Sequence, residues 1–122
     1  MKIADQLTTL NALSPIDGRY ASRADALRPF LSEAAYMAHR VEVEIAWLKA
    51  LADARLPELP TFDEEAVAVL DGLVSGFTED CAVRIKEIEK VTNHDVKAVE
   101  YFLKERVADH KVLSEAAEFI HF

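Results

Sequence analysis

The stretch 37–53, MAHRVEVEIAWLKALAD, is the clearest indication of the fold class. Its apolar residues recur three and four positions apart, and charged residues fall away from that side. The apolar positions are Met37, Val41, Ile45, Leu48 and Ala52, and the charged ones are Arg40, Glu42, Lys49 and Asp53. This spacing predicts a helix from about residue 32 to residue 55, roughly 36 Å long, that buries a single stripe.

Clear stop and start signals follow this helix. Pro57 and Pro60 end it, because proline lacks the amide donor and disfavours helical geometry in the residue before it. Thr61 and Glu64 have the spacing of a capping box and predict a second helix that ends near Gly76.

Two further helices are predicted in the second half of the chain. Thr78 and the acidic residues after it suit the start of a third helix, whose buried side is Ala82, Ile85 and Ile88. A fourth stripe runs from Asp95 to near Asp109, and the apolar piece 114–122 predicts the start of a fifth helix. We find no internal repeat and no linker, so we expect residues 1–122 to form a single all-α domain of about five helices.

Composition excludes several classes of protein. The 122 residues, 51% hydrophobic and 30% charged, suit a folded domain with a modest core. The 22 acidic and 14 basic side chains give a net charge of −8 without a basic run, so no nucleic-acid partner is expected. One cysteine, Cys81, and an N-terminal stretch unlike a signal peptide favour the cytoplasm. The apolar runs are far shorter than the about 20 residues that cross a bilayer.

The segment 14–20, SPIDGRY, is the first candidate site. Its proline, aspartate and glycine are turn residues, and they predict an ordered loop that presents Arg19 and Tyr20. An arginine offers a planar fork of donors to a phosphate or carboxylate, and a phenol can add a hydrogen bond. The alternative is a surface turn with a solvated arginine and a packed tyrosine.

The segment 89–95, EKVTNHD, is the second candidate site. We expect Thr92 or Asn93 to cap the fourth helix, which places His94 and Asp95 in its first turn, where free amides attract anions. A histidine there can donate to an anion or move a proton, and the carboxylate can bind hydroxyls or fix the tautomer of the ring. The alternatives are a simple helix start or an unbroken helix.

His121 is the third candidate, although a lone histidine between apolar residues is usually part of a core. The four histidines have no metal-binding spacing, so no metal site is expected. The chain also lacks the GxSxG, P-loop and GxGxxG motifs of hydrolases, nucleoside triphosphatases and dinucleotide-binding proteins. The last residues, 116–122, are apolar without a cap or polar tail, which predicts a chain cut within an element.

Three blocks of the sequence closely resemble the N-terminal region of the bacterial adenylosuccinate lyase family. They are residues 14–20, residues 84–104 (RIKEIEKVTNHDVKAVEYFLK) and residues 118–122 (EFIHF). The resemblance covers nearly the whole chain and favours this family over fumarases, aspartases and argininosuccinate lyases. It implies the N-terminal helical domain of the fumarase/aspartase superfamily, truncated before the central helical bundle.

The resemblance implies a homotetrameric enzyme of purine biosynthesis, on the routes to IMP and AMP, that needs neither cofactor nor metal. Such an enzyme eliminates fumarate from adenylosuccinate, giving AMP, and from SAICAR, giving AICAR. A base removes a proton next to a carboxylate, and an acid protonates the departing nitrogen. In the family the base is a serine and the acid a histidine, both downstream of these residues, so the isolated chain is expected to be inactive.

The resemblance also implies roles for individual residues. Arg19 and Tyr20 would contact the nucleotide, with Arg19 toward its phosphate, while the helix-start residues would line the pocket near the ribose and the succinyl group. His121 matches a histidine near the active site. The residues implied to bind substrate are therefore Arg19, Tyr20, Asn93, His94 and Asp95, with His121 as a further pocket residue. Sites in the family are assembled from three subunits, so other chains would complete this one.

Two other functions stay open at this point. A small acidic helical interaction module without catalysis would use Arg19, His94 and Asp95 only for turns and caps. Another lyase of the same superfamily would be distinguished by the succinyl compound that it cleaves.

Overall fold

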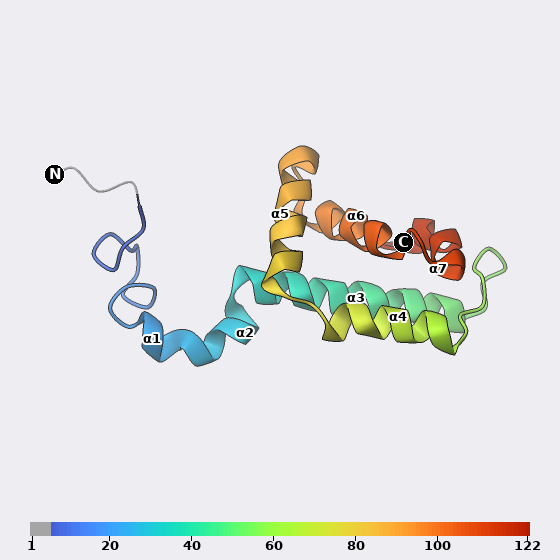
Figure 1. Ribbon diagram of the computed structural model, residues 1–122, viewed down its shortest axis with the longest axis horizontal. Helices are drawn as coiled ribbons and strands as arrows, with labels where there is room; N and C mark the ends of the chain where they lie inside the picture. Colours follow the sequence, from blue (N-terminus) through green and yellow to red (C-terminus); the bar gives the residue numbers. More distant parts are fainter. Residues whose placement is uncertain (1–5) are drawn as a thin grey trace. The chain divides into compact units, whose positions relative to one another are not determined.

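The computed structural model describes residues 6–122. All regular secondary structure in this range is helical, which confirms the predicted all-α fold class. The chain divides into two compact units, Met1–Ala35 and Tyr36–Phe122 (Figure 1). Residues 1–5, which begin the stretch predicted to lack a signal peptide, lie outside the described residues. Within residues 6–122, no helix has the length and apolar character that a bilayer span requires.

The first unit consists of turns followed by short helical segments. These are α1 (Ala21–Ala24), the 3₁₀ helix η1 (Asp25–Leu27) and α2 (Arg28–Leu31). Ser32 then adopts an extended conformation, and its hydroxyl accepts the amide of Ala35 at 3.1 Å. This hydrogen bond caps the helix that follows, which explains why the predicted start near residue 32 is close to the observed one.

The long helix α3 (Glu33–Asp53) forms where the stretch 37–53 predicted it. Its buried apolar residues are Ala35, Met37, Val41, Ile45, Leu48 and Leu51. The predicted stripe is confirmed except at Ala52, which is half-buried while its neighbour Leu51 is buried. Each large side chain buried in this way contributes roughly 1.5–3 kcal/mol.

Three more helices follow, α4 (Glu64–Ser75), α5 (Glu79–Thr92) and α6 (Asp95–Val107). The predicted cap of α4 at Thr61 was wrong, because Asp63 directly precedes the helix and its carboxylate accepts the Ala66 amide at 2.8 Å. Thr78 occupies the N-cap position of α5 as predicted. Its hydroxyl lies 3.5 Å from the Cys81 sulfur instead of capping an amide.

The C-terminal segment differs from the predicted fifth helix over residues 114–122. It forms α7 (Lys111–Glu115), the 3₁₀ helix η2 (Ala117–Phe119) and a final turn. The helix starts earlier because His110 caps it, with Nδ1 accepting the Leu113 amide at 3.2 Å. Leu113 and Ile120 anchor the segment in the core of the second unit.

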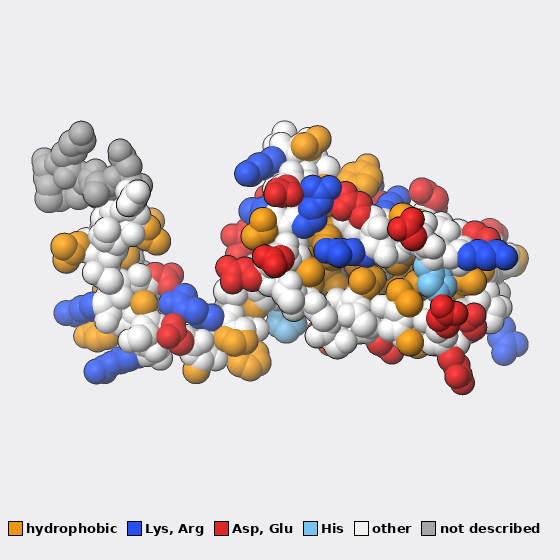
Figure 2. All heavy atoms as spheres, in the orientation of Figure 1, with side chains coloured by type: hydrophobic (Ala, Val, Ile, Leu, Met, Phe, Trp, Pro, Cys, Tyr) orange, Lys and Arg blue, Asp and Glu red, His pale blue; other side chains and the backbone are white. Residues whose placement is uncertain are grey.

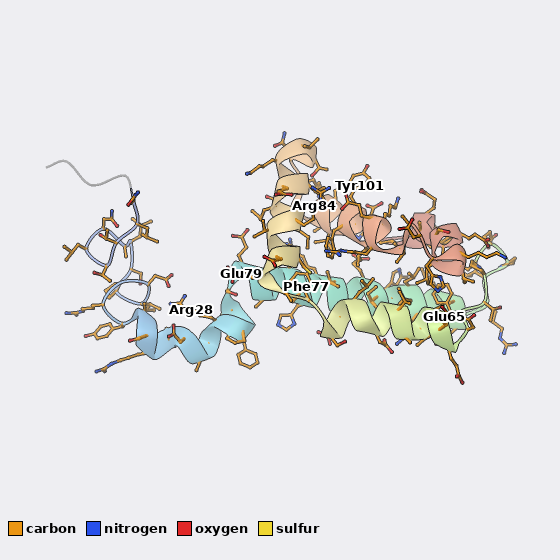
Figure 3. The ribbon with its side chains drawn as sticks, in the orientation of Figure 1. Arg28, Glu65, Phe77, Glu79, Arg84 and Tyr101 are labelled. Atoms are coloured by element: carbon orange, nitrogen blue, oxygen red, sulfur yellow. The ribbon has the colours of Figure 1, made fainter. Side chains whose placement is uncertain are left out.

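The core of the second unit draws on every long helix, and its largest fully buried side chains include Leu48, Leu70, Ile85, Phe102 and Leu113. Phe77 lies in the connection before α5 (Figure 3). Its ring meets the ring of Phe102 edge to face, with 6.3 Å between centroids.

Ion pairs join the helices at the surface. Lys49 of α3 contacts Asp71 of α4 at 2.7 Å. Arg84 of α5 donates to both carboxylate oxygens of Glu105 of α6, at 2.6 and 3.1 Å, which lowers the pKa of Glu105. Figure 2 shows acidic and basic side chains interspersed over this part of the surface. The negative net charge is therefore not gathered on the face drawn there.

Candidate functional site

The turn that carries Arg19 and Tyr20 is ordered by its own backbone, as predicted. The carbonyl of Pro15 accepts the amides of Gly18 at 3.2 Å and Tyr20 at 2.9 Å. A Cβ at Gly18 would lie 2.9 Å from the carbonyl oxygen of Thr9, so only glycine lets the two backbone segments approach this closely. The chain then enters α1 directly, with Tyr20 as its N-cap residue.

Arg28 fastens this turn to the helices that follow it within the first unit (Figure 3). Its guanidinium donates to Asp25 at 2.9 Å and to Asp17 at 3.1 Å. These hydrogen bonds, first the one to Asp25 and then the one to Asp17, raise the pKa of Arg28. The role of Arg28 in holding the turn was not predicted, because Asp17 lies 11 positions from it and no helical spacing relates the two residues.

Arg19 and Tyr20 form an exposed, positively charged corner. The guanidinium carbon of Arg19 lies 4.6 Å from the centroid of the Tyr20 ring, and that of Arg23 lies 5.8 Å from it. Tyr20 is 41% exposed, so it is not the packed tyrosine of the alternative interpretation. A guanidinium that stacks on a ring uses its face, which leaves the N–H groups at its edge directed sideways toward an anion.

The junction between α5 and α6 is a sharp break. Asn93 adopts a left-handed conformation with φ 50°, and its amide bonds the Glu89 carbonyl at 2.8 Å, which ends α5. His94 is extended and caps α6, with Nδ1 accepting the Lys97 amide at 3.0 Å. The prediction that Thr92 or Asn93 caps α6 was wrong, and so was the unbroken helix. Asparagine adopts the left-handed conformation more readily than other non-glycine residues, so it terminates a helix.

The cap determines which nitrogen of His94 carries the proton. Because Nδ1 accepts an amide N–H, the neutral ring must carry its hydrogen on Nε2. The side chain is 61% exposed, so a ligand can reach the ring. His94 is therefore built as a hydrogen-bond donor at a helix start, where anions are favoured.

Asp95 is held by α3 and by its own helix. Its Oδ2 accepts from Arg40 at 2.8 Å and its Oδ1 accepts from the Val96 amide at 2.9 Å. The hydrogen bond from Arg40, followed by that from Val96, holds the pKa of Asp95 below its usual range. The nearest approach to His94 Nδ1 is 3.9 Å, beyond hydrogen-bond distance, so the expectation that Asp95 fixes the tautomer of His94 is not met.

Arg40 is a second residue that sequence analysis missed. The helical spacing assigned it to the side of α3 away from the apolar stripe, yet its side chain is only 20% exposed. The guanidinium lies 4.1 Å above the ring of Tyr36 and reaches Asp95, which is 55 positions away in sequence. No local pattern indicates such a partner, because only the packing of α6 against α3 creates it.

His121 is an exposed residue in a left-handed conformation, with φ 60°, and not the core histidine that its neighbours suggested. Its Nδ1 lies 2.6 Å from Oε1 of Glu44 in α3. The next residue is also tied to α3, because Nε1 of Trp47 donates to the carbonyl of Phe122 at 3.1 Å. Glu44 is a third residue whose role the sequence spacing did not predict.

One face of α3 therefore anchors two of the three candidate segments. Arg40 binds Asp95 and Glu44 binds His121, and residues four apart on a helix lie about 5–6 Å from each other on one face. A shallow hollow of about 190 Å³ lies along this face, lined by Tyr36, His39, Arg40, Val43 and Glu44. The third segment, with Arg19 and Tyr20, belongs to the first unit.

Other parts of the described chain offer less chemistry. A hollow of about 750 Å³ lies at the α3–α4 connection, and none of the predicted site residues lines it. Among residues 6–122, no group of three His, Cys, Asp or Glu side chains is arranged to hold a metal ion. The face around Arg40 and Glu44 thus holds the carboxylate of Asp95 and the ring of His121, groups that can form hydrogen bonds with the polar groups of a ligand.

Comparison with known proteins gives a consistent result. No protein-family model matches the chain. The adenylosuccinate lyases of Haemophilus influenzae and Escherichia coli K12 are 54% and 51% identical to it, each over 118 residues. That of Buchnera aphidicola from Acyrthosiphon pisum is 41% identical over 118 residues. Each match covers 96% of this chain and 26% of the relative, so the chain spans about a quarter of their length.

Proposed function

With its homology to the adenylosuccinate lyases established over 96% of its length, we propose that this chain is the N-terminal helical domain, residues 1–122, of such an enzyme. Its residues form part of the site that binds adenylosuccinate and SAICAR. The rest of the enzyme supplies the central bundle, the acid and the base. The observation that carries the proposal is sequence identity of 41–54% along nearly the whole chain.

Arg19 binds the phosphate of the nucleotide in this proposal, with Tyr20 beside it. The support is chemical: an exposed guanidinium, stacked 4.6 Å above a phenol ring, directs its donors toward a group at its edge. A phosphate is the anion that such a planar fork binds best, together with carboxylates.

Asn93, His94 and Asp95 line the pocket near the ribose and the succinyl group. The Nε2–H of His94 suits an oxygen of a carboxylate or phosphate. The carboxylate of Asp95 accepts from Arg40 at Oδ2 and from the Val96 amide at Oδ1, and a carboxylate oxygen can accept a further donor such as a ribose hydroxyl. His121 contributes its ring to the same pocket.

The proposed reaction is a β-elimination. A base removes the proton from the carbon next to a carboxylate, the C–N bond breaks, fumarate leaves, and an acid protonates the departing nitrogen. The residues above are assigned neither proton transfer. They hold the charged ends of the substrate so that the reacting atoms align with groups from the rest of the enzyme. The isolated chain should therefore release no fumarate.

The assembly and location follow from the same proposal. The enzyme is a cytoplasmic homotetramer of purine biosynthesis without cofactor, nucleic-acid or membrane partner. The single cysteine and the acidic composition are consistent with this assignment.

A chimera tests the proposed function with the chain as it exists. Residues 1–122 replace the matching quarter of the Haemophilus influenzae enzyme, which is 54% identical over 118 residues. We expect the chimera to release fumarate from adenylosuccinate, measured by ultraviolet absorbance. A chimera that assembles like its parent but releases no fumarate would contradict the proposal and favour a non-catalytic helical module.

A matched pair of variants tests the pocket. His94 and His110 both cap a helix through Nδ1, at 3.0 and 3.2 Å from the amide that donates, but only His94 is assigned to the pocket. His94→Asn in the chimera should lower kcat/KM about 10- to 100-fold, the effect of losing a hydrogen bond to a charged group of about 1.5–3 kcal/mol. His110→Asn should leave it within about twofold. Equal effects of the two variants would show that capping, and not substrate binding, explains the loss.

A further inference from the structure

The contact between Glu44 and His121 has the features of a positioning pair. The Glu44 side chain is 12% exposed, and its Oε1 lies 2.6 Å from Nδ1 of His121. A carboxylate accepts hydrogen bonds and cannot donate, so Nδ1 must carry a proton. A bond of this length to a charged acceptor on a rigid helix also fixes the plane of the ring.

The backbone at His121 supports the same conclusion. A non-glycine residue at φ 60° is strained and persists only where its surroundings hold it. Here the Glu44 carboxylate binds the His121 side chain, and Nε1 of Trp47 donates to the carbonyl of Phe122 at 3.1 Å. Both holding residues come from α3, and their contacts add to a local turn in which the Phe122 amide donates to the Phe119 carbonyl at 3.2 Å.

The two pocket histidines are consequently set in opposite tautomers. His94 receives an amide N–H at Nδ1 and carries its hydrogen on Nε2. The Nδ1–H of His121 donates a hydrogen bond to Glu44, so in the neutral ring Nε2 has a free lone pair. One ring can donate to an anionic group, and the other can accept from a hydroxyl or amino group.

We propose that Glu44 is a positioning residue that keeps the His121 proton on Nδ1 and so presents Nε2 to the substrate as a hydrogen-bond acceptor. The substrate groups that such an acceptor recognises are the hydroxyl and N–H groups of a nucleotide. The tautomer is a property of this chain alone, whereas its use in binding rests on the proposed function.

Nitrogen NMR of the chain labelled with ¹⁵N-histidine tests the tautomer directly. At about pH 8.5, well above the ordinary histidine pKa of about 6.5, His94 and His110 should each show a pyridine-type Nδ1 and a pyrrole-type Nε2. His121 should show the reverse. A pyrrole-type Nε2 at His121 would overturn the proposal, whether or not Nδ1 also carries a proton.

Two glutamates of the same helix supply the variant and its control. Glu44→Ala should abolish the preference of His121 for the Nδ1–H form, leaving the His94 and His110 signals in place as evidence of folding. Glu42 lies 3.5 Å from His39 at an exposed position, so Glu42→Ala should leave His121 unchanged. An unchanged His121 spectrum in Glu44→Ala would also overturn the proposal. If Glu44→Ala does not fold, the wild-type spectrum decides.

Activity of the chimera separates this inference from the proposed function. Glu44→Ala should lower kcat/KM by up to about 100-fold, as expected when a binding group loses its alignment, and Glu42→Ala should not. An inactive wild-type chimera with the expected His121 tautomer would refute the proposed function and leave the positioning role intact. An active chimera that tolerates Glu44→Ala would refute the positioning role and leave the function intact.

Discussion

The cap at His94 allows the structural and the substrate-binding roles of one side chain to be separated. His94→Ala removes both the cap and the imidazole. His94→Asn removes the imidazole but restores an acceptor, because asparagine is among the best N-cap residues. We therefore expect the two variants to differ in stability and to agree in their loss of activity.

The expected difference in stability between His94→Ala and His94→Asn follows from the hydrogen bond at His94 Nδ1. The Nδ1 acceptor satisfies one helix amide at 3.0 Å, and a lost cap costs about 1 kcal/mol, with a range of about 0.5–2. The side chain is 61% exposed, so lost packing adds little. With a urea m-value of about 1–3 kcal/mol/M, His94→Ala should lower the unfolding midpoint by about 0.3–1 M. His94→Asn should stay within about 0.3 kcal/mol of the wild type.

The assay uses the single tryptophan of the chain. Trp47 lies on α3 and donates to the carbonyl of Phe122, so its fluorescence reports on unfolding of the second unit. Urea titrations of the two variants and the wild type give the midpoints. The chimera carrying the same variants gives kcat/KM for fumarate release.

Two results would refute this reasoning. If His94→Asn were as unstable as His94→Ala, the Nδ1 hydrogen bond would not be the source of the stability. If the loss of activity followed the loss of stability across the two variants, His94 would serve only as a cap. Activity lost about equally in both, with stability lost in one, is the expected outcome.

Three further predictions concern the backbone and the charges of the same regions. Asn93→Gly should preserve stability and Asn93→Ala should cost about 1–2 kcal/mol in urea unfolding, because the position is left-handed at φ 50°. The folded-state pKa of Asp95 lies below its unfolded value, so the stabilisation by Arg40 is complete above about pH 4 and is lost as the pH falls through the folded-state pKa. The urea midpoint should therefore fall on acidification below about pH 4, and fall less in Asp95→Asn. Gly18→Ala should speed limited proteolysis of the first unit while the tryptophan transition of the second stays unchanged, since the new Cβ would lie 2.9 Å from the Thr9 carbonyl oxygen.

Local sequence patterns predicted the elements well where buried apolar residues repeat at a fixed spacing or where turn residues occur together. The apolar stripe of α3 follows from a repeat of three and four residues, and the turn before Tyr20 follows from its proline and glycine. Caps were predicted less well. Several polar residues next to a helix start can accept an amide, and the backbone conformation of Asp63 or His94 decides between them.

The candidate site also has a part that local sequence predicted and a part that it did not. Its segments were recognised from residue types that suit anions and turns, and from the resemblance of three blocks to one enzyme family. The contacts that orient the site residues were not recognised. Arg40 lies 55 positions from Asp95 and Glu44 lies 77 positions from His121, so no periodicity relates them.

The amino-acid sequence by itself determined the helical fold class and the turn that presents Arg19, because these depend on interactions within a few residues. The tertiary structure decided which nitrogen of His121 carries a proton and which groups hold Asp95 and His121 in place. The physical reason is that hydrogen bonds between distant residues exist only once packing has brought their helices together. A single face of α3 supplies both of these contacts.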